Sequence, residues 1–218
     1  MNPRTWQPEG QETDDSGVWL SVGDLMSVVL MIFALLLISA LVQISEAHEE
    51  SQNTRIVIIK DINDALQSAG IEVHADPNTG DISIMDSILF DRNQYQLKAS
   101  GKQFLDEFVP IYTQVIFKNQ QTADEISRIV IEGHSSSEGL FERNMSLSVL
   151  RANSVSQYIS SMVFKDKAKF FDKVAISGRG PIEANKQQAD PTDRKVKFRF
   201  QFKDDEFLGY FSEVKRVE

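Results

Sequence analysis

Residues 18–42 read VWLSVGDLMSVVLMIFALLLISALV, an apolar run whose only charged side chain belongs to Asp24. A helix over these 25 residues would be about 37 Å long, which exceeds the ~30 Å hydrocarbon core of a bilayer. The sequence therefore predicts a transmembrane helix over residues 18–42. This helix separates a short tail, residues 1–17, from a long polar remainder.

Asp24 has the clearest functional implication in this span. A carboxylate within the hydrocarbon core is costly, and it usually faces a partner helix or an ion path rather than lipid. Ser21 and Ser27 lie three residues to either side, on the same helical face, and would form a polar stripe with Asp24. A second interpretation stays open: Asp24 would mark the membrane interface at the helix N-terminus, with the apolar core running over residues 25–42.

A cleaved signal peptide is the main alternative for the N-terminal segment. The tail before the apolar run is acidic, with Arg4 as its one basic residue. The run is also longer than the roughly 7–15 residues of a typical signal-peptide core, and it contains a charge. We therefore expect the span to be retained as a membrane anchor.

The composition argues against several classes of function. The 218 residues carry a net charge of −9, which gives no support to nucleic-acid binding. The chain has no cysteine, so disulfides, thiol catalysis and cysteine-ligated zinc are excluded. His48, His74 and His134 lack metal-ligand spacing, so we expect neither a bound metal nor a cofactor. The sequence shows no catalytic triad, carboxylate dyad or phosphate loop, which favours a non-enzymatic protein.

Periodicity predicts an α+β domain after the span, with a mixed sheet covered by helices. Residues 43–70 are expected to be a connector helix that ends at Gly70. Its apolar residues recur at helical spacing: Ile56, Ile59, Ile62 and Leu66. Residues 71–84 are typical of two short strands around a turn at residues 76–80.

The domain is expected to occupy residues 71–203, followed by a C-terminal extension at 204–218. We predict helices over residues 100–118 and 145–163 and strands over 127–132 and 174–177. The second helix is expected to turn five apolar residues inward: Leu147, Leu150, Val155, Ile159 and Met162. Residues 194–202 alternate between apolar and polar side chains, which indicates a half-buried strand.

Two adjacent segments carry a family resemblance. Residues 133–139 read GHSSSEG, and residues 144–152 read NMSLSVLRA. They resemble the peptidoglycan-binding domain of the OmpA/MotB family, whose pattern is a Gly-His-Thr-Asp-x-x-Gly loop followed by Asn-x-x-Leu-Ser-x-x-Arg-Ala on a helix. The second half matches completely. Weaker fits at residues 88–90, 97–101, 174–180 and 193–196 extend the resemblance over about residues 82–202.

The resemblance implies an OmpA-like fold and a site for diaminopimelate. In that family the helix arginine and the loop aspartate hold the diaminopimelate carboxylate and its amino-acid backbone. Arg151 takes the arginine position, and a guanidinium can bind a carboxylate through two parallel hydrogen bonds. Ser136 replaces the aspartate and cannot pair with an ammonium group, so Glu138 is the suggested substitute. Asn144 is expected to shape the loop, and Arg194 to lie nearby.

The span and the domain together resemble the B subunit of ion-driven stators of the MotB type. In those subunits an aspartate at the start of the span carries the ion; Asp24 falls on that position, and Ser21 and Ser27 would support the ion path. The implied partners are a ring of five membrane subunits of the MotA or ZorA type, a second copy of this chain, and peptidoglycan. The implied cargo is H⁺, with Na⁺ as the alternative.

The resemblance also implies a place in the cell. The protein would cross the bacterial inner membrane once, with a cytoplasmic N-terminus and a periplasmic domain. The short connector and the acidic tail resemble the stator-like subunits of Zorya anti-phage systems more than flagellar ones. We therefore expect a subunit that couples ion flow to rotation, serving defence. The alternatives are a motility stator and, from another class, a passive wall tether without ion transport.

Overall fold

The computed structural model describes residues 15–188 and 190–203, and their side chains from Val22 onward. Contacts divide the chain into two units, residues 1–49 and residues 50–218, and each is described by itself. Residues 1–14 of the predicted tail and the whole predicted extension at 204–218 lie outside the described range.

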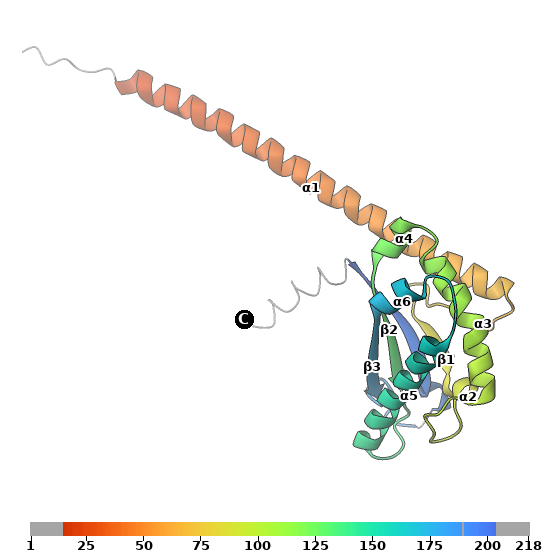
Figure 1. The fold of residues 1–218 in the computed structure, drawn as a ribbon. Helices are drawn as coiled ribbons and strands as arrows, with labels where there is room; N and C mark the ends of the chain where they lie inside the picture. Colours follow the sequence, from red (N-terminus) through yellow and green to blue (C-terminus); the bar gives the residue numbers. More distant parts are fainter. Residues whose placement is uncertain (1–14, 189, 204–218) are drawn as a thin grey trace, which may run out of the picture. The chain divides into compact units, whose positions relative to one another are not determined.

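The first unit consists of the N-terminal part of α1, a helix that runs from Asp15 to Ser68 (Figure 1). The connector predicted at 43–70 is helical as far as Ser68 and forms the C-terminal part of α1. Every described side chain from residue 22 to residue 49 is exposed. Within the described chain, α1 is the one helix long and apolar enough to span a membrane by length and composition.

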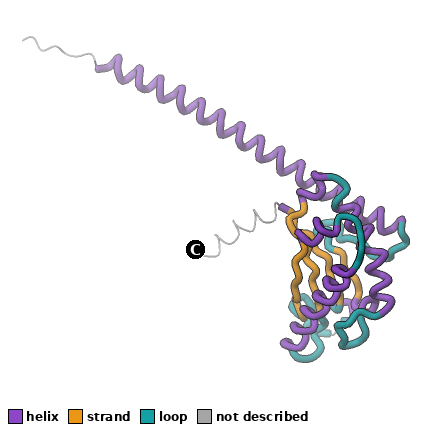
Figure 2. Tube along the Cα trace, viewed as in Figure 1, coloured by secondary structure: helices purple, strands orange, loops and turns teal. Residues whose placement is uncertain are grey.

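The second unit is built around a four-stranded sheet (Figure 2). The C-terminal part of α1 is followed by β1 (Ile82–Met85), α2 (Asp86–Leu89), α3 (Ala99–Ile116), α4 (Gln120–Glu125), β2 (Ile126–His134), α5 (Phe141–Ser161), α6 (Lys167–Lys173), β3 (Val174–Gly180), the 3-10 turn η1 (Pro191–Asp193) and β4 (Lys195–Phe202). The strand order is β1-β4-β2-β3; β2 and β3 are parallel, and the other two pairs are antiparallel. The predicted α+β class with a mixed sheet is confirmed.

The hydrophobic core lies between the sheet and its helices. The apolar residues of β4 are all buried, as their alternation predicts: Val196, Phe198, Phe200 and Phe202. On α3, Phe108 meets Phe198 edge to face at 5.1 Å between ring centroids, and Tyr112 stacks on Phe200 at 5.5 Å. The helix α5 packs on β2 and β3 (Figure 1). The C-terminal part of α1 contributes Ile58, Ile62 and Leu66 to the same core.

Two apolar residues of the predicted helical patterns, one on α1 and one on α5, are exposed. Ile56 is 62% exposed, because the buried stripe of α1 is formed by Ile58, Ile59, Ile62 and Leu66 and begins two residues later. On α5, Leu150 is also exposed, and the buried face includes Arg151, Val155 and Ile159. The polar Arg151 points inward, and an apolar periodicity cannot indicate this.

The first of the two predicted strands over residues 71–84 is also wrong. Only an isolated bridge joins Ala75 to Ile82, and the regular strand begins at Ile82. At Ala75 the side chain of Asn63 takes the place of a strand partner: its Oδ1 accepts from the Ala75 N–H at 2.7 Å and its Nδ2 donates to the Ala75 carbonyl at 3.3 Å. A side chain therefore satisfies backbone groups that would otherwise need a neighbouring strand.

Candidate functional site

A pair of glycines lets α5 approach the sheet closely. Gly133 on β2 and Gly178 on β3 are register partners, and a Cβ at either position would collide with residues 148–149 of α5. Ser148 completes the contact: its hydroxyl accepts a hydrogen bond from the Gly180 N–H at 3.0 Å. This packing fixes where α5 lies relative to the carboxyl end of β2, and so where the side chain of Arg151 lies.

The loop between β2 and α5 is held by Asn144. Its Nδ2 donates to the carbonyl oxygens of Ser136, at 3.2 Å, and Glu138, at 2.6 Å. An amide NH₂ has two donors, so one asparagine can bind two loop carbonyls at once. The structure therefore places Asn144 where it shapes the loop, and Ser136, a residue of that loop, is buried.

Arg151 is buried, with only 2% of its surface exposed. Its Nη2 lies 3.0 Å from Oδ2 of Asp86, and its Nε donates to the Gln94 carbonyl at 3.0 Å. The guanidinium carbon lies 5.2 Å from the centroid of the Phe90 ring. Burial lowers the pKa of Arg151 below its ordinary value, and the negative charge of Asp86 opposes this shift. A buried guanidinium needs such partners, because an unpaired charge in the interior is strongly destabilising.

Asp86 is the residue of this site that the sequence did not identify. It begins α2 and its backbone N–H donates to the Arg194 carbonyl at 3.0 Å. The pKa of its carboxyl group is raised above the ordinary value, because the effect of burial exceeds the opposing effect of the positive charges of Arg151, Arg194 and Lys98. The only signal in the sequence is an acidic residue directly after the alternation of β1, and this signal does not name its distant partner, Arg151.

These residues surround one pocket of about 370 Å³. All five residues predicted for peptidoglycan binding line it: Ser136, Glu138, Asn144, Arg151 and Arg194. Asp86 lines it as well. Two atoms of the central ion pair, Oδ1 of Asp86 and Nη1 of Arg151, have no hydrogen-bond partner. A pocket with an unpaired anionic acceptor beside an unpaired cationic donor is suited to a ligand that carries both kinds of group.

A sequence profile of the OmpA family matches residues 89–197, half of the chain. The chain belongs to the OmpA family. The matched segment contains the loop, α5 and most of the pocket described above, but it begins after Asp86.

Curated relatives extend the similarity beyond the OmpA-family domain. The chain is 26% identical over 217 residues to the Zorya protein ZorB of the Crooks strain of Escherichia coli, covering 87% of this chain and 89% of that protein. It is 22% identical over 200 residues to ZorB of an ETEC strain, covering 84% and 80%. Among solved structures, a MotB-like protein from Desulfovibrio vulgaris has a TM-score of 0.50 at 15% identity, covering 72% of this chain and 95% of that one, which supports the shared fold.

A second charged cluster lies elsewhere in the OmpA-family domain. Glu132, His134 and Glu183 have potential metal-ligand atoms within 4.8 Å of one another. Both carboxylates already have cationic neighbours: Lys197 Nζ lies 2.9 Å from Glu183, and Arg199 Nη1 lies 3.4 Å from Glu132. His134 bridges the two, with Nε2 at 2.9 Å from Glu132 and Nδ1 at 3.7 Å from Glu183. This arrangement is an ion-pair network that ties β2 to β4 and to the loop after β3.

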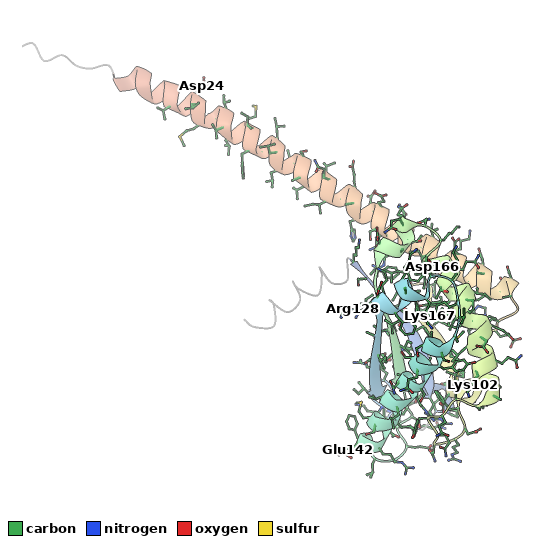
Figure 3. All side chains as sticks on the ribbon, in the orientation of Figure 1. Asp24, Lys102, Arg128, Glu142, Asp166 and Lys167 are labelled. Atoms are coloured by element: carbon green, nitrogen blue, oxygen red, sulfur yellow. The ribbon has the colours of Figure 1, made fainter. Side chains whose placement is uncertain are left out.

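The residues predicted for ion transport lie outside the OmpA-family domain, on the N-terminal part of α1. Figure 3 marks Asp24 on this helix, and its side chain is exposed. Ser27 donates its hydroxyl proton to the Gly23 carbonyl at 2.8 Å, within the same helix. The side chain of Ser21 lies outside the described ones.

Proposed function

We propose that this chain is a stator-type B subunit, whose single span carries an ion and whose OmpA-family domain holds peptidoglycan. One observation carries the proposal. The same chain combines an exposed apolar helix interrupted by one carboxylate, Asp24, with a domain whose pocket contains a buried arginine, Arg151. The similarity to ZorB covers most of both proteins, which supports a common architecture for the span and the domain together.

Asp24 would act as the ion carrier. A charged carboxylate is far costlier than a neutral one in a water-poor environment, so proton binding changes its interaction with the surrounding helices by several kcal/mol. A change of this size is enough to shift a two-state packing equilibrium. Two copies of the chain inside a ring of five partner subunits would then drive the ring stepwise as protons pass. Sodium is the alternative cargo.

The OmpA-family domain would anchor the protein to peptidoglycan. Arg151 would bind a stem-peptide carboxylate, with Asn144 holding the loop and Arg194 at the rim of the pocket. This requires a periplasmic domain and a cytoplasmic N-terminus in the inner membrane. Because both curated relatives are Zorya proteins, we propose that the motor serves anti-phage defence.

The decisive test replaces Asp24 with asparagine, which fixes the neutral form at nearly constant shape. Asp24→Asn should assemble with the partner subunits but abolish both phage protection and the proton influx that a cytoplasmic pH reporter records. Asp24→Glu, which keeps an ionisable group one methylene away, should retain part of both. Ser39→Asn is the matched control, since it places the same amide in the same span, and it should remain active.

A passive wall tether makes the opposite prediction. It would tolerate Asp24→Asn, with full protection and no change in cytoplasmic pH. That result would eliminate the stator function and leave only the wall-binding half of the proposal.

A further inference from the structure

We propose that Asp86 is the acidic half of the ligand pocket: it receives an ammonium group of a ligand whose carboxylate binds Arg151. Asp86 would thereby supply the negative charge that is absent at Ser136 in the loop. This inference rests on the proposed peptidoglycan binding and specifies the ligand as a zwitterionic amino-acid end of the stem peptide.

The geometry of the ion pair supports this assignment. Oδ2 of Asp86 and Nη2 of Arg151 lie 3.0 Å apart, while Oδ1 and Nη1 of the same pair have no partner. Both residues line the pocket. An α-amino acid carries its ammonium and carboxylate groups on one carbon, so a single ligand can provide a donor for Asp86 and an acceptor for Arg151. Binding would satisfy two polar atoms that are otherwise buried without partners.

The other two acidic side chains that line the pocket, Asp91 and Glu138, are exposed and fit this role less well. Glu138 is more than half exposed and lies 3.7 Å from Arg194, a loose pair at the rim of the pocket. Asp86 is only 7% exposed, so its charge is poorly hydrated and an incoming ammonium group displaces little water. Its backbone is also fixed, because its N–H donates to the Arg194 carbonyl.

Asp86 lies outside residues 89–197, the segment that matches the OmpA family profile. The acidic group of this pocket therefore comes from a part of the chain beside the family core, from α2 rather than from the loop after β2. A carboxylate on α2, instead of one in the loop, still places a carboxylate and a guanidinium in the same pocket.

The same ion pair permits the reverse role, in which Asp86 competes with the ligand for Arg151. The two roles predict opposite effects of Asp86→Asn on ligand affinity. An ammonium receptor makes Asp86→Asn bind diamino ligands more weakly. A competitor makes Asp86→Asn bind every carboxylate more tightly.

Calorimetric titration of the full chain in detergent separates these cases with two probes, meso-diaminopimelate and pimelate. Pimelate has the same carbon chain and both carboxylates but lacks the ammonium groups. We expect the wild type to prefer meso-diaminopimelate by about 10- to 100-fold, the range of one charge-assisted hydrogen bond. Asp86→Asn should reduce this preference to near unity. A purely structural effect would weaken both probes equally and keep the ratio.

Matched variants complete the test. Glu142→Gln removes an exposed carboxylate of α5 that does not line the pocket, and it should keep the wild-type ratio. The double variant Asp86→Ser with Ser136→Asp moves the carboxylate to the loop and should restore the preference for meso-diaminopimelate. If Asp86→Asn does not fold, this double variant still tests the proposal.

Three results would overturn the proposal: an unchanged ratio in Asp86→Asn, tighter binding of both probes by that variant, or loss of the preference in Glu138→Gln instead. Wild-type protein that binds neither probe nor purified sacculi would instead overturn the proposed wall binding itself, so the two failures are distinguishable.

Discussion

Along residues 22–49 of α1 the apolar side chains are exposed on every side of the helix, whereas along residues 50–68 they are buried on one face. Phe33 in the first region is 64% exposed, whereas Phe198, which shares a core with the second region, is fully buried. A helix that is apolar all round is suited to lipid or to partner helices, and one with a single apolar stripe is suited to a protein core. The two parts of the same helix are therefore suited to different surroundings.

The carboxylates of the two regions show the same contrast. Asp86 is stabilised by Arg151 within its own unit, so its charge is balanced whether or not a partner protein is present. Asp24 lies in an apolar helix whose function we attribute to a larger assembly. Charges inside a soluble domain are paired by the fold, while a charge in a span has to be paired by other subunits or neutralised by an ion.

The largest expected difference between the regions concerns glycine. Gly133→Ala would place a Cβ against the carbonyl oxygen of Ser148 and force α5 away from β2, so we expect a loss of at least about 3 kcal/mol of unfolding free energy. Gly23→Ala has open space around the new Cβ and should leave domain stability unchanged. Thermal unfolding in detergent, followed by circular dichroism, measures both.

Equal melting temperatures for wild type and Gly133→Ala would contradict the close packing of α5. If Gly23→Ala prevents co-purification with the partner subunits, the comparison becomes sharper, because a partner helix must then pack against Gly23.

The matched phenylalanines come next. Phe198→Ala removes a fully buried ring that contacts Phe108 and Tyr112, and should cost about 3–5 kcal/mol. Phe33→Ala should not change the stability of the domain, because its ring is exposed in the other unit. Urea unfolding followed by far-UV circular dichroism would measure the unfolding free energies of the two variants. Similar losses in both variants would refute the division into two independent units.

A smaller effect is expected for wall binding. Arg151→Ala should reduce co-sedimentation of the full chain with purified sacculi by about 10- to 100-fold, the value of one charge-assisted pair. Arg143→Ala is the matched control, since it removes an exposed arginine of α5 outside the pocket. Arg151→Lys keeps the charge but not the fork, and should bind at an intermediate level. Equal binding by Arg151→Ala and the wild type would place the site elsewhere.

The smallest effect concerns the network around Glu183. Burial by itself raises the pKa of Glu183, but the hydrogen bond and charge of Lys197, with His134 and Arg179, lower it to about 2, against an ordinary value of 4.5. A lowered pKa means that the charged form stabilises the fold above pH 4.5, and that this contribution is lost as the pH falls toward 2. The partial exposure of Glu183 keeps the contribution modest.

Glu183→Gln should therefore be slightly less stable than wild type at pH 7, and the difference in stability should shrink as the pH falls below 4.5. Melting curves of both proteins between pH 7 and pH 3 measure the trend, with Glu142→Gln as the control. A difference that is constant with pH would show that the charge of Glu183 contributes nothing.

Much of this architecture could be read from local sequence. Alternation alone predicted β4, because the pleat of a strand sends successive side chains to opposite faces. The length and composition of residues 18–42 predicted the long apolar helix, since a membrane span is recognised by those two properties. The family resemblance predicted that two residues of α5, Asn144 and Arg151, would meet at one site, and both line the pocket. Their proposed roles in binding stay predictions.

Other features depend on contacts between distant residues. The inward rotation of Arg151, at the expense of Leu150, follows from its pairing with Asp86, which a pattern of apolar residues cannot reveal. Where a strand was predicted at residues 71–75, the backbone of Ala75 pairs with the distant side chain of Asn63. Periodicity records what each segment buries, but an ion pair between α2 and α5 exists only once the sheet has brought their ends together. The sequence by itself determined the apolar span, the two long helices of the domain, strand β4 and the position of Arg151 on α5; only the tertiary structure decided which carboxylate lies beside that arginine.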